Sequence, residues 1–84
     1  MTKQEELTNP NSCMNKAHDC EMTFVLLARD PAAAETIRFW INLRVASGRN
    51  LRSDPKILEA EKCIQEMERQ LTARNQAINA AKRK

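Results

Sequence analysis

Arginine is the residue type with which this sequence could do most chemistry, because guanidinium groups bind phosphate through paired hydrogen bonds. Four basic residues surround the only glycine: Arg44, Arg49, Arg52 and Lys56. Lys56 lies at a predicted helix start, whose first N–H groups also favour anions. Arg29 and Arg38 join the group if the fold brings them close. The spacing predicts an anion site. A solvated basic loop is the alternative, since Asp54 repels an anion there unless an arginine neutralises it.

Trp40, the only tryptophan, is a second candidate. An indole ring offers a flat surface on which a base or a nicotinamide ring can stack, above all across a subunit boundary. Arg38 lies two residues earlier, on a different helical face, so we expect no stacking between the two within one helix. The general behaviour of tryptophan favours the alternative, a place in the core or in an oligomer interface.

Metal binding and catalysis find little support in the sequence. Cys13, His18 and Cys20, with Cys63 as a distant fourth ligand, lack the Cys-x2-Cys or His-x3-His spacing of zinc sites. One histidine and one glycine provide neither a serine–histidine–aspartate arrangement nor a glycine-rich phosphate loop. We therefore expect no metal, no cofactor and no enzymatic activity.

The composition indicates one small domain with a modest core. The chain has 84 residues, and only three of them are aromatic. Such a chain often completes its core by self-association, so we expect a homo-oligomer. The net charge of +3 weakly favours anionic partners. Three cysteines and an apolar run too short to span a membrane predict free thiols in the cytoplasm of a bacterium or an infected host.

Two Asp-Pro pairs predict the starts of two helices, because aspartate caps free N–H groups and proline fits the first helical position. The first helix is expected from about 31 to 47, with Gly48 as its stop. The second is expected from about 55 to 81. It carries a heptad seam of Ile57, Ile64, Leu71 and Ile78, with Ala60, Met67, Arg74 and Ala81 three positions further on.

The predicted fold class is all-α, an antiparallel helical hairpin completed by homo-oligomerisation. Residues 1–20 are expected to form a mobile polar arm, because they show no apolar periodicity. Residues 21–84 are expected to form a single helical domain. The apolar segment 22–28 could be a short strand or a further packed segment, either helical or extended, and the sequence leaves this open.

Two stretches carry a resemblance to a known group of proteins. The first is Phe24-Val25-Leu26-Leu27-Ala28-Arg29-Asp30-Pro31 with Ile37-Arg38-Phe39-Trp40, and the second is Asp54-Pro55-Lys56-Ile57-Leu58-Glu59-Ala60 with Cys63 and Met67-Glu68. Together, over about residues 22–69, they resemble small uncharacterised helical proteins of tailed phages and prophages. The resemblance brings no catalytic residues. It implies a phage setting, in which some small helical oligomers sequester a nucleotide-derived immune signal.

The leading hypothesis is a non-enzymatic phage protein that sequesters such a phosphate-bearing signal at subunit interfaces. Arg29, Arg38, Arg49 and Arg52 would hold phosphates and Trp40 would wall the site. One alternative is an inhibitor of a host defence protein, such as a CRISPR effector, bound through segment 22–28 or the second helix. Another is nucleic-acid binding, against which the five acidic residues between 54 and 84 argue. A structural role in the phage also stays open.

Overall fold

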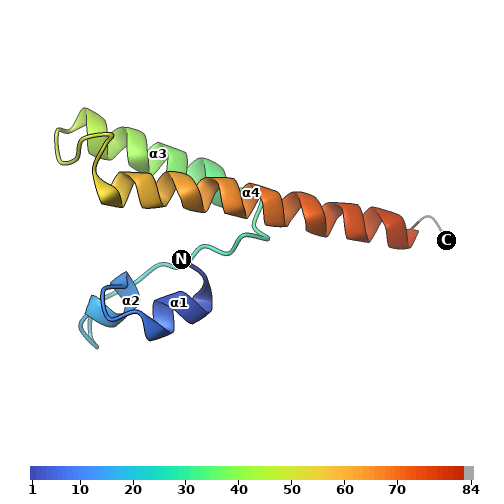
Figure 1. Ribbon diagram of the computed structural model, residues 1–84, viewed down its shortest axis with the longest axis horizontal. Coiled ribbons are helices and arrows are strands. Elements are labelled where there is room, and N and C mark those ends of the chain that lie inside the picture. The colour runs from blue at the N-terminus through green and yellow to red at the C-terminus, as the bar shows by residue number, and fades with distance from the viewer. Residues whose placement is uncertain (83–84) are drawn as a thin grey trace.

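The computed structural model describes residues 1–82, which form four helices and no strand. In chain order these are α1 (Lys3–Thr8), α2 (Cys13–Lys16), α3 (Ala33–Ala46) and α4 (Pro55–Lys82). Helix α3 packs along the first half of α4, and α1 packs on α2 below them in the view of Figure 1. The predicted all-α class is confirmed for these residues.

Helix α3 begins at Ala33, two residues later than predicted. The Asp30 carboxylate accepts a hydrogen bond from the Ala32 N–H at 2.8 Å, and the Asp30 carbonyl accepts one from the Ala33 N–H at 3.1 Å. Asp30 therefore closes a turn ahead of the helix, and Pro31 lies in that turn. The prediction that Asp30 caps the helix is wrong, because its short side chain satisfies the nearest loop N–H first.

Gly48 ends α3 as predicted. Its φ of 73° is left-handed, a conformation that glycine adopts without steric cost. The Gly48 N–H donates to the Val45 carbonyl and the Arg49 N–H donates to the Arg44 carbonyl, both at 3.1 Å. These two bonds form a Schellman motif, which satisfies the last carbonyls of the helix.

Helix α4 begins at Pro55 as predicted, but Asp54 acts differently from the expectation. The Asp54 carbonyl accepts hydrogen bonds from Ile57 and Leu58, both at 3.0 Å. Its carboxylate turns back into the loop and accepts hydrogen bonds from the Leu51 N–H at 2.9 Å and the Asn50 side chain at 3.1 Å. The carboxylate thus secures the loop rather than the first turn of α4.

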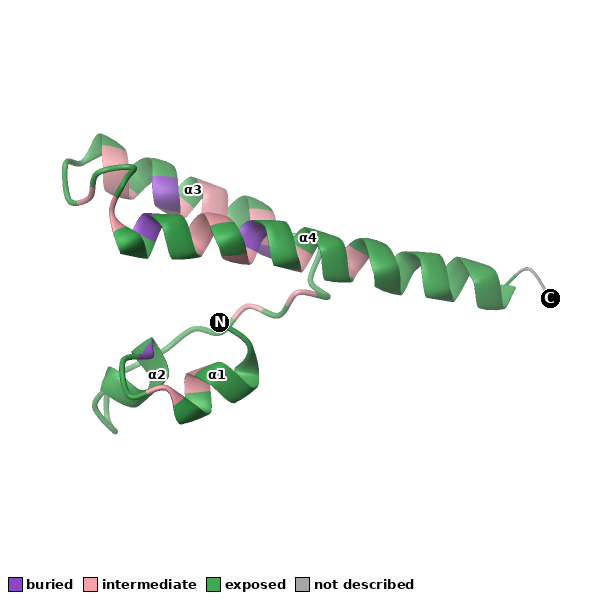
Figure 2. Ribbon diagram, in the orientation of Figure 1, coloured by how far each residue is buried: buried purple, intermediate pink, exposed green. Residues whose placement is uncertain are grey.

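The core is a small apolar contact between α3 and α4. Ile41 of α3 and Ile57 and Ile64 of α4 are its buried members, marked purple on the two helices in Figure 2. Partly buried residues surround them: Ala34, Ile37, Trp40, Val45 and Ala60. Burying an isoleucine side chain contributes about 1.5–3 kcal/mol. A few such residues hold the two helices together.

Only the first half of the heptad seam of α4 is buried. Helix α3 has 14 residues and α4 has 28, so α3 covers half of its partner. Leu71 is half-buried, Ile78 is 40% exposed, and residues 72–82 are all exposed.

Residues 1–20 contain two short helices where the sequence predicted a polar arm. Thr2 and Glu5 form a capping box at the start of α1. Ser12 is fully buried between the two helices. Its hydroxyl donates to the Glu6 carbonyl at 2.6 Å and accepts from the Asn15 N–H at 3.1 Å. Hydrogen bonds between polar groups, rather than an apolar face, hold residues 1–16 together. A search for hydrophobic periodicity in the sequence therefore does not detect these helices.

Segment 22–28 is neither a strand nor a helix. It runs as an extended connection below α4 (Figure 1). Leu26 and Ala28 are half-buried, whereas Met22 is 94% and Phe24 is 85% exposed. Most of the apolar surface of this segment is therefore open.

The folded chain is extended for its mass. Its exposed surface is 7052 Å² and its radius of gyration is 15.3 Å. A compact monomer of 9.6 kDa exposes about 5,100 Å². A compact chain of this length has a radius of gyration of about 12 Å. The surplus surface of roughly 2,000 Å² is what an incomplete core leaves exposed.

We expect the substitution Ile57→Ala to lower the free energy of unfolding by about 2–5 kcal/mol, because it leaves a cavity between α3 and α4. Leu58→Ala is the matched control, since Leu58 is 51% exposed and adjacent. It should cost less than about 1 kcal/mol. Urea denaturation followed by circular dichroism measures both, and equal losses would contradict a core centred on Ile57.

Candidate functional site

Three of the predicted site residues meet at the loop end of the α3–α4 pair. The guanidinium carbon of Arg44 lies 5.7 Å from the centroid of the Trp40 ring, and Lys56 Nζ lies 5.9 Å from it. Trp40 and Arg44 are one turn apart on α3, and Lys56 is in the first turn of α4. We call Trp40, Arg44 and Lys56 the loop-end cluster. Both cations lie within the distance at which an indole ring attracts positive charge.

A short chain of polar contacts holds Arg44 in place. Its Nε donates to the Asn50 side-chain oxygen at 2.6 Å, and the Asn50 amide nitrogen donates to the Asp54 carboxylate at 3.1 Å. Hydrogen bonds from the Leu51 N–H and then from Asn50 lower the pKa of Asp54. The carboxylate is thereby engaged by the loop, and Arg44 uses only one of its nitrogens in this network.

The two basic side chains of the loop-end cluster are not paired with carboxylates of the described residues. Among residues 1–82 neither Arg44 nor Lys56 has an ion pair with a carboxylate. Arg49 belongs to the adjoining turn, because its N–H donates to the Arg44 carbonyl at 3.1 Å. The cluster therefore offers unneutralised basic groups beside a half-buried aromatic ring.

The structure places Arg38 and Arg52 elsewhere. The Arg38 guanidinium forms ion pairs with Glu35 on its own helix and with Glu68 of α4, the latter at 2.6 Å. Arg52 contacts the Asn42 side-chain oxygen at 3.5 Å. Both arginines line a cleft of about 330 Å³ that also contains Glu61 and Glu68. The ion pair of Arg38 with Glu68 therefore connects α3 to α4, and the pair with Glu35 lies within α3.

Arg29 is also not part of the loop-end cluster. It is exposed in the turn before α3, whereas the cluster lies at the other end of that helix. Fourteen helical residues span about 21 Å, so Arg29 is far from Lys56 within one chain. The six basic residues grouped by the sequence are thus separated by the fold.

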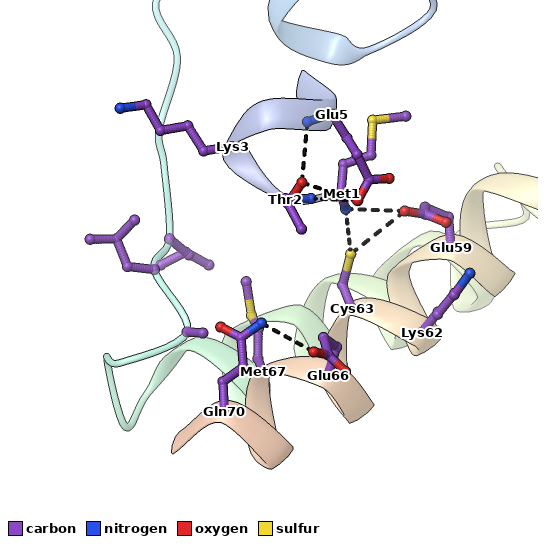
Figure 3. A pocket seen from close by; sticks show the side chains of 13 residues that line it. Met1, Thr2, Lys3, Glu5, Glu59, Lys62, Cys63, Glu66, Met67 and Gln70 are labelled. Carbon is purple, nitrogen blue, oxygen red and sulfur yellow. Dashed lines mark hydrogen bonds and ion pairs between the residues drawn. The ribbon is translucent and has the colours of Figure 1, made fainter. Parts of the chain in front are cut away.

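A second cleft, also of about 330 Å³, lies where α1 and segment 26–28 meet α4 (Figure 3). The α-amino group of Met1 donates hydrogen bonds to Glu59 at 3.1 Å and to Cys63 Sγ at 3.2 Å. Burial works against the charged amine, but these bonds prevail and raise its pKa. At the rim, hydrogen bonds from Arg69 and Gln70 lower the pKa of Glu66 to about 2. Sequence reasoning missed this cleft, because the Thr2–Glu5 capping box indicates a helix but not that Met1 contacts α4.

Neither a metal centre nor a membrane span is found in the described part of the chain. Within residues 1–82, no group of three or more histidine, cysteine, aspartate or glutamate side chains is arranged to hold a metal ion. Cys13 and Cys20 are exposed, Cys63 is half-buried, and all three thiols are free. None of the helices in that range has the length and apolar character needed to cross a membrane.

Comparison of the chain with protein-family models, with curated proteins and with solved structures finds no match. The function is therefore inferred from the chain's own residues. Of the predicted site residues, those in the loop-end cluster are the ones that the fold brings together around an aromatic ring.

We expect Asn50→Ala to raise the pKa of Asp54 towards its ordinary value of 3.8, because one of its two hydrogen bonds is lost. Asn42→Ala is the matched control, since Asn42 contacts Arg52 instead. Carboxyl chemical shifts during an NMR pH titration measure the change.

The lowered pKa also fixes how Asp54 affects stability. Its contribution is fully present above the unfolded value of 3.8 and is lost as the pH falls through the folded value. The wild-type protein should therefore lose more stability than Asp54→Asn during acidification below pH 4. The same acid loss in both proteins would contradict the network.

Proposed function

We propose that this chain is a non-enzymatic binding protein that holds a phosphate-bearing nucleotide at the loop-end cluster. The observation that supports this most is the approach of two cations, Arg44 and Lys56, to the one Trp40 ring. Their like charges repel each other, and a bound anion would relieve that repulsion. A guanidinium, an ammonium and an aromatic ring together offer what a nucleotide presents: phosphate and a flat base.

The contacts of Arg44 suit it to this role. Asn50 takes the Nε donor, so the guanidinium plane is held while its two terminal nitrogens can reach a phosphate. Lys56 adds three rotatable donors on a flexible stem. Arg49 in the adjoining turn contributes a further positive charge. The proposed site is therefore Trp40, Arg44, Arg49 and Lys56, without Arg29 and without the ion-paired Arg38.

Self-association belongs to the proposal. A pair of helices alone cannot enclose a nucleotide, whereas small-molecule sites bury most of their ligand. The surplus exposed surface of this chain supports a homo-oligomer in which a second copy covers part of the site. No catalytic role is proposed for any residue in it.

The setting proposed for this activity is a phage-infected bacterial cytoplasm. It rests on the resemblance to small helical phage proteins that the motifs in residues 22–69 led us to expect. In that setting a stable nucleotide-binding oligomer would act by sequestration: it would lower the free concentration of an immune signal without converting it.

A second candidate function is direct binding to a host defence protein. The outer face of α3 favours it: Phe39 is 71% and Leu43 is 57% exposed. These residues lie one turn apart, on the face opposite Ile41, so α3 is apolar on two sides. Paired exposed apolar side chains on a helix are typical of a protein-binding surface. Nucleic-acid binding is less favoured, because acidic residues interrupt the basic surface of α4.

Trp40 fluorescence tests the nucleotide proposal directly, since the chain has no other tryptophan. We expect nucleotides with two or more phosphates to change that signal. Lys56→Gln should weaken binding about tenfold, or roughly 1.4 kcal/mol, through loss of one charged donor. Lys62→Gln makes the same charge change on α4 away from the ring and should leave the Kd unchanged.

Two results would contradict the site. Equal weakening by Lys56→Gln and Lys62→Gln would indicate non-specific attraction to a basic surface. Absence of any fluorescence response to nucleotides, at concentrations up to millimolar, would remove nucleotide binding from the loop-end cluster.

The second candidate makes a different prediction. Phe39→Asp should abolish binding of a purified host protein partner, measured by calorimetry, because it places a charge in the centre of the outer face of α3. The nucleotide response of Trp40 should persist in this variant. Full partner binding by Phe39→Asp would exclude the outer face of α3.

A further inference from the structure

The second half of α4 has no packing partner within the described chain. Residues 72–82 are all exposed, and α3 is the helix with which α4 makes its contacts. Figure 2 shows this overhang as a single exposed helix extending past α3. An isolated helix of about a dozen residues is marginal in water. Because residues 72–82 are nevertheless helical, we expect another surface to pack against them and stabilise the helix.

The overhang carries the rest of the heptad seam. Leu71 and Ile78 are seven residues apart, with Arg74 and Ala81 at the second seam position. Seven-residue spacing keeps these side chains on one stripe of α4. The stripe continues the seam from Met67, which is half-buried. The stripe passes from a partly covered region into a bare one.

We propose that a second copy of this chain covers the stripe, with the two overhangs of α4 packed antiparallel. This contact is separate from the one in the proposed function that covers the loop-end cluster, and it does not depend on nucleotide binding. Paired about a two-fold axis near residue 76, Leu71 of one copy faces Ala81 of the other, and Arg74 faces Ile78. The aliphatic stem of Arg74 covers the isoleucine while its charged end stays in water.

Charge selects the antiparallel orientation. Within residues 59–70, Glu59, Glu61, Glu66 and Glu68 outnumber Lys62 and Arg69, whereas residues 71–82 carry Arg74 and Lys82 and no acidic residue. With the axis near residue 76, antiparallel packing places Lys82 of each copy opposite Gln70 of its partner, two residues from Glu68, and it places Arg74 opposite Ile78 rather than opposite a second arginine. Parallel packing sets Arg74 against Arg74 in the seam. Opposed helix dipoles favour the antiparallel pair further.

The exposed area of the whole chain favours a second copy as the occupant. The surplus of roughly 2,000 Å² per chain lies within the range that one partner buries in an obligate homodimer. The overhang supplies a self-complementary stripe of the kind that a two-fold interface requires.

Analytical ultracentrifugation of the full chain without ligand tests the proposal. We expect a dimer at micromolar concentration, and we expect Ile78→Glu to shift the protein to monomer with at least a tenfold weaker dimer Kd. Ala80→Glu is the matched control, because it adds the same charge on the opposite side of the overhang and should leave the dimer intact. A monomeric wild type, or equal behaviour of the two variants, overturns the proposal.

A cysteine introduced at Ala81 tests the orientation, in a background with Cys13, Cys20 and Cys63 changed to serine. In the antiparallel pair the two 81 positions are about 15 Å apart along the axis, too far for a disulfide. Oxidation should therefore give no covalent dimer, and rapid crosslinking would overturn the antiparallel arrangement. Far-ultraviolet circular dichroism confirms that each variant stays helical.

Failure of this proposal and failure of the nucleotide site are distinguishable. Ile78→Glu acts on the dimer and Lys56→Gln acts on the Trp40 response to nucleotides. A monomer that binds nucleotides would overturn the overhang pairing and the self-association in the proposed function but would keep the loop-end cluster as the binding site. A dimer that ignores nucleotides would overturn nucleotide binding at the loop-end cluster and would keep the overhang pairing.

Discussion

The contact of Ile41 with Ile57 and Ile64 is the constraint on which the rest of the structure depends. It sets how α3 lies along α4, and that placement alone brings Lys56 to the Trp40 ring. The ion pair between Arg38 and Glu68 spans the same two helices, but both groups are partly exposed, so solvent screens it. Burial of apolar side chains thus determines how α3 and α4 pack, and the charged side chains lie around that contact.

Sequence patterns predicted what local chemistry decides. The Asp-Pro pair at residues 30–31 and the glycine at 48 located α3 to within two residues, because the fit of proline to a helix start and the left-handed φ of glycine are properties of short stretches. The two aspartates show the limit. An aspartate before proline can cap the helix or close the preceding turn, and here the Asp30 and Asp54 carboxylates both bind loop N–H groups. The Asp-Pro sequence is the same whether the aspartate caps the helix or closes the turn before it, so the sequence does not distinguish the two.

The candidate site was predictable only in part. Trp40 and Arg44 are four residues apart, so their meeting on one face follows from helix geometry. The approach of Lys56 depends on the register between α3 and α4, which no local pattern encodes. The sequence grouped Arg38 with them by proximity along the chain. Two residues from Trp40 is about 200° around the helix, and that rotation places Arg38 beside Glu68 instead.

The two proposals constrain each other. Lys56 and Ile78 are 22 residues apart on one straight helix, or about 33 Å, so overhang pairing leaves the two loop-end clusters at opposite ends of the dimer. That interface cannot enclose a nucleotide. Enclosure then requires a second contact, and the outer face of α3 is suited to it, because Leu43 is three residues from Trp40 and 57% exposed. Two α3 faces meeting there would join dimers beside the Trp40 rings. A protein partner bound to Phe39 and Leu43 would block that assembly, so the two proposed functions would compete for one surface.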